Sequence, residues 1–455
     1  MALRTQRRRV GHSQPRGSVM SRVTRWIFAA LALLLTSQLM ASPYAPGEAP
    51  AEVLLLQGGR IVTMDPQQGE DGVISDGDVL IRDGRIAAVG RSLPVPDDAE
   101  VIALNGRHIY PGLVGLDTTL GLVEISAVRA TVDTEEVGTF TPEVQGHIAF
   151  NADSEVIPTV RSNGLTHVQV VPQNGLVSGR SSLMHTDGWH WEDALVKAND
   201  ALHVRWPSPR PRWSWFGGSS GSDPVERAQR ERRELLDFFD EARAYHLRRS
   251  ADEETPRDER LEAMRGVFGG DVRLFIHADG LRQIEQAIRF AESEDLAFTL
   301  VGGRDAWRLA DELAAAEIDV VYTATFGMPI RDGDGYDAAF RAPAILDEAG
   351  VKTALAYSGY WDTRNLAFAA GYLVAHGLDR QTALAMITRT PAEMLGVGDE
   401  IGRIAPGYSA SLLVSSGDVL DYREHAVEAL FIDGRQVDLG NHHKALAEKY
   451  RQRLR

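Results

Sequence analysis

Residues 111–121 read Pro-Gly-Leu-Val-Gly-Leu-Asp-Thr-Thr-Leu-Gly, and the interpretation of the whole chain starts from this stretch. Along a β-strand, residues i and i+2 point to the same side, so Asp117 and Thr119 share a face and Thr118 lies between them. Asp117 is the residue of the three whose side chain commonly binds a metal.

The composition is that of an ordinary globular protein. The chain has 455 residues, of which 44% are hydrophobic and 25% charged, enough for a large core and a smaller second domain. The formal net charge of -16 argues against binding to nucleic acid, which needs clustered Lys and Arg. With no cysteine, the chain has no disulfide, thiolate ligand or cysteine nucleophile. We expect a small-molecule substrate or ligand, no nucleic-acid partner and an open choice between monomer and homo-oligomer.

The first 42 residues have the pattern of a secretory signal peptide. An Arg-rich opening precedes an apolar run at 26–35, and small residues follow. About ten apolar residues are too few to cross a bilayer, so we expect no membrane span after cleavage. A retained anchor is the alternative, and Met20 is an alternative start of translation. The expected location is the bacterial periplasm or the exterior.

Both ends of the remaining chain are rich in short strands. Residues 51–108 contain several, with the pair Asp83-Gly84 between alternating apolar segments, and residues 399–440 repeat this style around Asp433-Gly434. An Asp-Gly pair in that setting favours a two-residue hairpin. The sequence predicts a composite β-sandwich assembled from both ends, with a tail helix at 441–455.

The long middle, 109–398, alternates strands with amphipathic helices. This order favours parallel pairing, and its length suits a (β/α)8 barrel of the TIM type. The fold class is therefore α/β, although few strands can be read before residue 270. The predicted strands are 166–171, 272–277, 297–302, 319–323 and 352–357, and the predicted helices are 281–293, 305–316, 338–349, 365–376 and 380–388.

A Pro- and Gly-rich segment interrupts the middle and opens an insertion at about 206–260. Its Trp206, Trp213 and Trp215 are candidates for a substrate mouth, and the alternative is that they anchor the insertion on the barrel. Arg180, in a glycine-rich segment after a predicted strand, is a further candidate for binding an anion there. A plain tight turn is the alternative for that segment.

Several segments in this order resemble the metal-dependent amidohydrolase superfamily, imidazolonepropionase-related type. They are Pro111-Gly-Leu, Val272-Arg-Leu-Phe-Ile-His-Ala-Asp-Gly, Gly402-Arg-Ile-Ala-Pro-Gly and the strands at both ends, and together they span roughly 51–440. The resemblance implies a metal-bearing (β/α)8 barrel with a composite β-sandwich. It also implies hydrolysis of C–N bonds in cyclic amides, amino-heterocycles or blocked dipeptides.

Position by position, the resemblance implies that most usual ligands have been lost. Asp117 and Thr119 stand where the family has its first two histidines, Gly302 where it has the strand-6 histidine, and Ser358 where it has the strand-8 aspartate. His277 stands at the strand-5 histidine. The bridging residue of strand 4 has no identified equivalent. The metal site is therefore expected to be degenerate.

Two hypotheses follow. In the first, an exported hydrolase holds one divalent metal, with zinc expected, at Asp117 and His277 together with Glu124, His167 or His185. In the second, the chain is a metal-free periplasmic binding or scaffold protein built on the same barrel. The sequence leaves the catalytic residues unassigned.

Overall fold

The computed structural model describes residues 44–69, 71–210 and 223–454, which contain two eight-stranded sheets. In these ranges no helix combines the length and apolarity needed to cross a membrane. The predicted signal peptide at 1–42, together with Trp213 and Trp215, lies outside the described residues.

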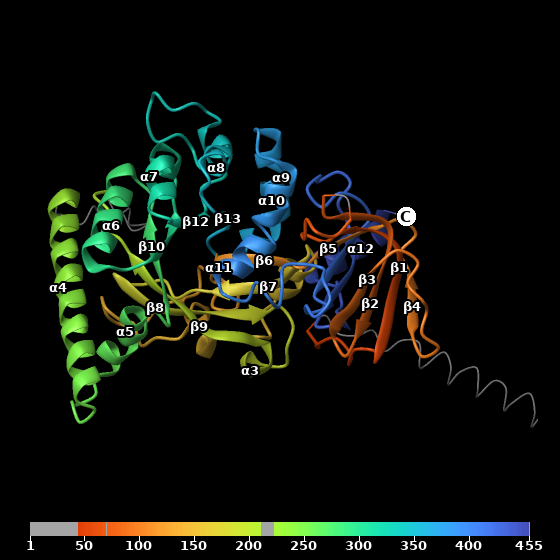
Figure 1. Cartoon of the computed structure of the whole chain (residues 1–455), viewed down its shortest axis with the longest axis horizontal. Coiled ribbons are helices and arrows are strands. Elements are labelled where there is room, and N and C mark those ends of the chain that lie inside the picture. The colour runs from red at the N-terminus through yellow and green to blue at the C-terminus, as the bar shows by residue number, and fades with distance from the viewer. Residues whose placement is uncertain (1–43, 70, 211–222, 455) are drawn as a thin grey trace, which may run out of the picture. The chain divides into compact units, whose positions relative to one another are not determined.

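The first sheet is a nearly closed barrel, as the alternation of strands and helices predicts (Figure 1). Its strands follow one another in chain order, so neighbours in sequence are neighbours in space. They are β6 (Leu113–Thr118), β7 (Leu165–Val170), β8 (Val177–His185), β9 (Leu195–Arg205), β10 (Arg273–Ala278), β11 (Phe298–Gly302), β12 (Asp319–Tyr322) and β13 (Thr353–Leu355).

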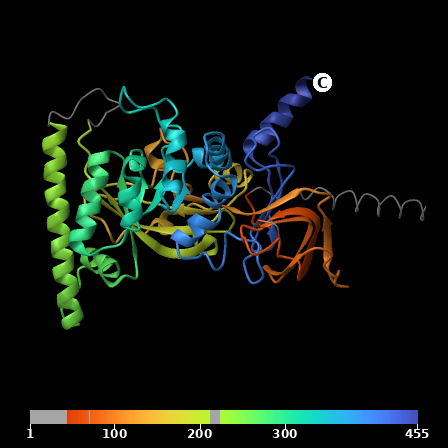
Figure 2. The same ribbon diagram turned by 45° about the horizontal axis from the view of Figure 1, so that its top comes forward.

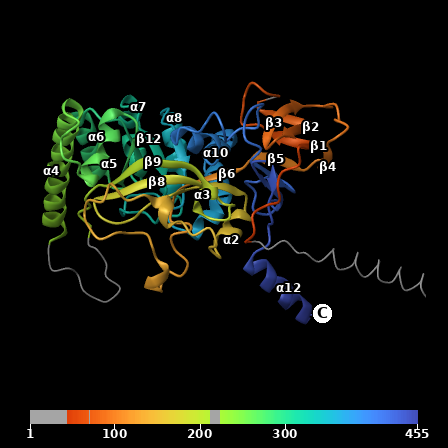
Figure 3. The same cartoon turned by 90° about the horizontal axis from the view of Figure 1, so that it is seen from below.

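One strand of the barrel runs against the others, which corrects the expectation of parallel pairing throughout. Strand β8 pairs antiparallel with both β7 and β9, and Figure 3 shows β8 beside β9. The cause is the length of the connection: residues 171–176 join β7 to β8, and a parallel crossover needs a dozen residues or more. Gly175, with φ of 74°, helps this connection to turn.

Helices cover the barrel beside strands β9 to β13. Those that follow β10 to β13 stand along one side of the sheet (Figure 1). The predicted helix at 305–316 is a 3-10 turn, η3 (Ala306–Leu309), followed by α7 (Ala310–Ala315). The other helices are α2 (Ile157–Arg161), α3 (Trp191–Ala194), α4 (Pro224–Ala251), α5 (Glu259–Gly269), α6 (Leu281–Glu294), α8 (Ala338–Glu348), α9 (Leu366–Ala375), α10 (Arg380–Ala385) and α11 (Arg389–Met394), with short 3-10 turns η1 (Arg129–Thr131), η2 (Gly146–Ala149) and η4 (Asp362–Asn365).

The second sheet combines strands from both ends of the chain. Strand β14 pairs with β5, which joins the C-terminal strands to the N-terminal ones. Asp83 and Gly84 both have positive φ in the turn between β2 and β3, as their sequence predicts. The strands are β1 (Val53–Val62), β2 (Val73–Arg82), β3 (Arg85–Gly90), β4 (Glu100–Ala103), β5 (His108–Pro111), β14 (Leu412–Ser415), β15 (Val427–Ile432) and β16 (Arg435–Gln436).

The chain ends in a helix, α12 (His442–Leu454), within the range 441–455 that was predicted as a tail helix. None of its residues is buried, and it projects away from both sheets (Figure 2). The insertion contributes the long helix α4, whose buried Leu235, Phe238 and Phe239 belong to the main core. The insertion is therefore packed on the barrel by apolar contacts.

The junction of β5 and β6 requires a glycine at position 112, which gives a first prediction. A Cβ at Gly112 would lie 2.8 Å from Cβ of Thr166 and closer still to its Oγ1 and Cγ2. Thr166 is fully buried and is hydrogen-bonded to Leu113 O and His167 Nδ1, so it has no free space to move into. We expect Gly112→Ala to lower the free energy of unfolding by roughly 1–3 kcal/mol, the usual cost of overpacking.

The measurement is the apparent thermal midpoint, followed by tryptophan fluorescence. Gly333→Ala is the matched control, because no atom lies within 4 Å of a Cβ at that loop position. Equal midpoints for the two variants would contradict the close contact with Thr166.

Candidate metal centre

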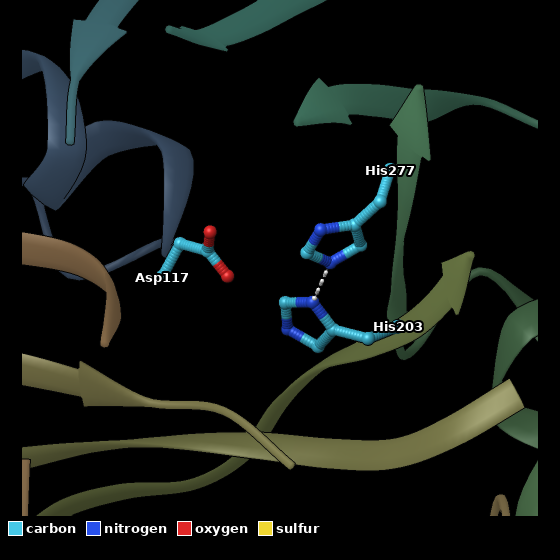
Figure 4. A group of neighbouring side chains, drawn as sticks. All are labelled: Asp117, His203 and His277. Atoms are coloured by element: carbon cyan, nitrogen blue, oxygen red, sulfur yellow. Dashed lines mark hydrogen bonds between the residues drawn. The ribbon is translucent and has the colours of Figure 1, made fainter. Parts of the chain in front are cut away.

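Three potential metal ligands from three strands meet inside the barrel. Asp117 comes from β6, His203 from β9 and His277 from β10, and one ligand atom of each lies within 4.8 Å of the other two (Figure 4). These residues lie near the carboxyl ends of their strands, which is where active sites of TIM barrels form. The sequence predicted two of the three, Asp117 and His277.

Asp117 is turned toward the cluster by a bulge in β6. Gly115 pairs with Val168 and Thr118 with Val170, so two residues of β6 face one residue of β7. The backbone of Asp117 has φ of 51°, a left-handed conformation that Asp tolerates better than most residues. The ligand position thus depends on a local irregularity of the strand.

The carboxylate of Asp117 is held on one oxygen only. The Ser358 hydroxyl donates to Oδ2 at 2.5 Å, and the Asp117 amide donates to Gln169 Oε1 at 3.3 Å. The other oxygen, Oδ1, is buried and accepts no hydrogen bond from the described residues. A buried carboxylate oxygen without a partner is costly, and a cation would satisfy it.

The two imidazoles lie against each other. Strands β9 and β10 run parallel with His277 opposite Arg205, and His203 Nδ1 is 2.8 Å from His277 Nε2. One of these nitrogens must carry a proton for this hydrogen bond to form. His203 is fully buried with its ring edge on Phe275, while His277 is partly buried. Both rings are thus fixed by packing before any ligand arrives.

Burial and a nearby cation keep both imidazoles neutral. Burial, followed by the positive charge of Arg205, lowers the pKa of His203 and of His277 well below the usual value. Burial raises the pKa of Asp117, and the charge of Arg205 and the Ser358 hydrogen bond oppose that rise. Neutral imidazoles with an available lone pair are the form that binds metals.

The donor set fits a divalent metal of the zinc or iron type. One carboxylate and two imidazoles give the three protein ligands that catalytic zinc sites use, with a fourth position left for water. The sequence-based expectation of only two surviving ligands is therefore too low, because His203 supplies a third.

Of the other positions that the resemblance marked as lost ligands, one contacts the cluster and one lies next to Asp279. Ser358 contacts Asp117 directly. Gly302 ends β11 with φ of 100°, and a Cβ there would lie 2.9 Å from Oδ1 of Asp279. Thr119 is buried, and its amide donates to Gly359 O, so its backbone helps to close the barrel.

The prediction that Glu124, His167 or His185 supplies the third ligand is wrong. His167 lies opposite His185 in the β7–β8 register, with ring centroids 4.8 Å apart, and His185 Nε2 is 3.4 Å from Asp433 Oδ2. Because β8 is reversed, its last residue lies toward the beginning of β7, away from the strand ends that hold Asp117. Glu124 lies in the loop after β6, where its Oε1 accepts from Asn151.

The candidates for a substrate mouth are placed as follows. Trp206 is 4% exposed, its ring packs on Phe290 and its Nε1 donates to Gln286 Oε1, which favours the anchoring role over contact with a substrate. Arg180 lies within β8, where its guanidinium donates to Glu143 O. The glycine-rich segment around it is therefore mostly strand, preceded by the turn at Gly175.

His203 was missed because no strand was predicted between residues 171 and 272, where β8 and β9 lie. Its signal is the segment Ala201-Leu-His-Val-Arg, an apolar strand end just before Trp206-Pro207, in which His203 and Arg205 alternate with apolar residues. Reading that segment as a strand would have placed His203 beside His277.

Comparisons with known proteins agree with this architecture. The model of the Amidohydrolase family matches residues 347–438, and amidohydrolase tasK of Hapsidospora irregularis is 27% identical over 402 residues. That match covers 79% of this chain and 39% of tasK. A dihydroorotase of Syntrophus aciditrophicus (strain SB) is 36% identical over 92 residues, 19% of this chain and 20% of that protein. The chain therefore spans less than half the length of these relatives.

The solved structure of an amidohydrolase from Thermotoga maritima MSB8 extends the likeness to most of the fold. It aligns with a TM-score of 0.73 and 25% identity, over 85% of this chain and 99% of that one. The partial match to the family model, the similarity to tasK and the shared fold together show that the chain belongs to the metal-dependent amidohydrolase superfamily.

Proposed function

We propose that this protein binds one divalent metal, with zinc expected, at Asp117, His203 and His277, and hydrolyses a C–N bond of a small-molecule amide there. The observation that carries the proposal is the convergence of these three ligand atoms within 4.8 Å. Cyclic amides and blocked dipeptides are the first substrate classes to test, and an imidazolonepropionase-related subtype is part of the proposal.

A divalent metal in this site would supply the Lewis acidity that brings the pKa of bound water toward neutrality. The protein's own groups prepare the site for that chemistry. Ser358 holds one carboxylate oxygen of Asp117 and leaves the other free. Arg205 places a positive charge near the cluster, where it would stabilise negative charge that develops on a substrate oxygen.

Asp279 is the group we propose as the proton acceptor, in place of the carboxylate that Ser358 replaces. It follows His277 by two residues just beyond the end of β10, and its charge acts on Asp117. Its Oδ1 lies beside Gly302, 2.9 Å from where a Cβ at that position would stand. It is partly exposed, so a proton it accepts can pass to solvent.

A hollow of about 350 Å³ beyond the ends of β6 and β7 offers a route from solvent. Its lining includes Leu122 from the loop after β6 and Pro172 just after β7. The carbonyl of Pro172 accepts from Nη2 of Arg205, which links this hollow to the charge beside the cluster. We propose that the substrate enters here.

The metal content of the purified chain tests the first step. We expect about one zinc, iron or manganese per chain, and loss of that metal in His203→Ala, His277→Ala or Asp117→Ala, because each removes one of the three candidate ligands. The measurement is elemental analysis of protein prepared without chelators or a histidine tag.

His190→Ala is the control, since its exposed imidazole contacts Glu192 and Asp193 outside the cluster. Thermal unfolding of each variant separates loss of metal from loss of fold. Wild-type protein without stoichiometric metal would favour the alternative, a metal-free binding or scaffold protein.

The role of Asp279 gives a separate prediction. Asp279→Asn should lower the turnover number by about 100- to 10,000-fold, the range for loss of a general base, while the metal content stays at the wild-type value. The assay is hydrolysis of the best substrate from a panel of cyclic amides and N-blocked dipeptides. Asp271→Asn, an exposed carboxylate just before β10, should leave turnover unchanged. Unaltered turnover in Asp279→Asn would rule out this proton acceptor.

We also propose that the chain is exported. The support is the Arg-rich start, the short apolar run at 26–35 and the absence of cysteine. In a Gram-negative host, the full chain should appear in the periplasmic fraction with its N-terminus near residue 43. A cytoplasmic product that keeps residues 26–35 would refute export by cleavage.

A further inference from the structure

Behind the three ligands lies a second layer of buried polar side chains. Gln169 on β7, Ser181 on β8 and Asp200 on β9 are at most 2% exposed. Ser181 donates a short hydrogen bond to Asp200 Oδ1, and the Gln169 amide donates to Ser181 Oγ at 3.0 Å and to Asp200 Oδ1 at 3.1 Å. We call these three residues the polar bridge.

The polar bridge contacts the candidate metal centre at two points. Ser181 Oγ is 2.8 Å from Nε2 of His203, the ring nitrogen that faces away from His277. Gln169 Oε1 accepts a hydrogen bond from the backbone amide of Asp117. The reversed strand β8 makes the first contact possible, because its antiparallel register sets Ser181 opposite Ala201 on β9.

Counting protons fixes the state of His203. The Ser181 hydroxyl has one hydrogen, which it donates in a hydrogen bond to the carboxylate of Asp200. Toward the imidazole, Ser181 Oγ can therefore only accept a hydrogen bond. His203 Nε2 must then carry the ring proton, because a neutral imidazole has one N–H. The lone pair is left on Nδ1, which lies toward His277 and Asp117.

We propose that Asp200 and Ser181, supported by Gln169, are positioning residues that hold His203 as the Nε2–H tautomer and so present Nδ1 to the metal. This inference rests on the proposed function. Metal-binding histidines usually donate their second ring N–H to a fixed acceptor, and loss of that acceptor commonly weakens metal binding 10- to 100-fold.

A serine nucleophile is the competing interpretation of Ser181, His203 and Asp200, and the geometry is against it. Ser181 is fully buried, so no substrate reaches its Oγ. Its hydroxyl donates a hydrogen bond to Asp200 rather than to the imidazole, whose Nε2 has no lone pair to accept one. The order of the hydrogen bonds is therefore the reverse of what activation of a serine requires.

A purely structural role is also a poor explanation of Asp200. Burial raises its pKa to about 6, and its Oδ2 has no hydrogen-bond partner among the described residues. A neutral Asn of the same shape would avoid the cost of burying a charge. A carboxylate at this position is explained by a need for a group that only accepts the hydrogen bond from Ser181 at neutral pH.

The test uses the full chain with two variants, Asp200→Asn and Ser181→Ala. In Asp200→Asn the new amide can donate to Ser181, which frees the hydroxyl to donate to His203 Nε2 and favours the opposite tautomer. The two readouts are zinc affinity, from competition with a chromophoric chelator, and the tautomer of His203 in metal-free protein, from ¹H–¹⁵N NMR of the ring. We expect zinc to bind 10- to 100-fold more weakly in both variants.

Ser182→Ala is the matched control. Ser182 is the next residue of the same strand, equally buried, and its hydroxyl pairs with Nδ1 of another imidazole, His147, at 2.8 Å. Its zinc affinity and the His203 tautomer should match those of the wild type, and thermal unfolding reports the cost of losing a buried hydroxyl in either serine variant.

The inference is overturned if metal-free wild-type His203 carries its proton on Nδ1, or if both variants keep the Nε2–H tautomer and wild-type zinc affinity. Its failure is distinguishable from failure of the proposed function. A wild-type chain that takes up no zinc would refute the metal site, and the NMR spectra would still decide whether the polar bridge sets the tautomer.

Discussion

Closure of the barrel between β6 and the segment after β13 is the constraint on which the site depends. Thr118 and Gly359 form an isolated parallel bridge, and the amide of Thr119 donates to Gly359 O. This closure brings Ser358 to Asp117 although 241 positions separate them in the chain. Without it, the carboxylate would lose the hydrogen bond that orients it, and the three ligands would not share one interior.

The interior of the barrel is electrostatically unusual for a core. Asp117, Asp200, His203 and Gln169 are all buried, and Arg205 lies close enough to lower the pKa of both imidazoles. Such a concentration of polar groups is expensive unless the groups satisfy one another or a ligand. Most of these groups are hydrogen-bonded to one another. The unpaired oxygen of Asp117 marks the place that a ligand would fill.

Much of the fold could be predicted because it rests on local patterns. The strands that end at His277 and Gly302 and the helices that follow them show clear periodicity, and the Asp-Gly pairs form the expected turns. The barrel's first half could not be read in the same way. Strands β8 and β9 carry polar residues that face the interior, so the usual alternation of apolar and polar residues is obscured.

The sequence by itself predicted the family architecture and, through the resemblance, two of the three candidate ligands, Asp117 and His277, each near the end of an apolar segment. Only the tertiary structure decided the third ligand and the polar bridge. The short connection at 171–176 forces β8 to run backwards, and this reversal carries His185 away from the site and brings Ser181 to His203. Strand direction and register are non-local properties, because they depend on how segments pair in space rather than on the residues of any one segment.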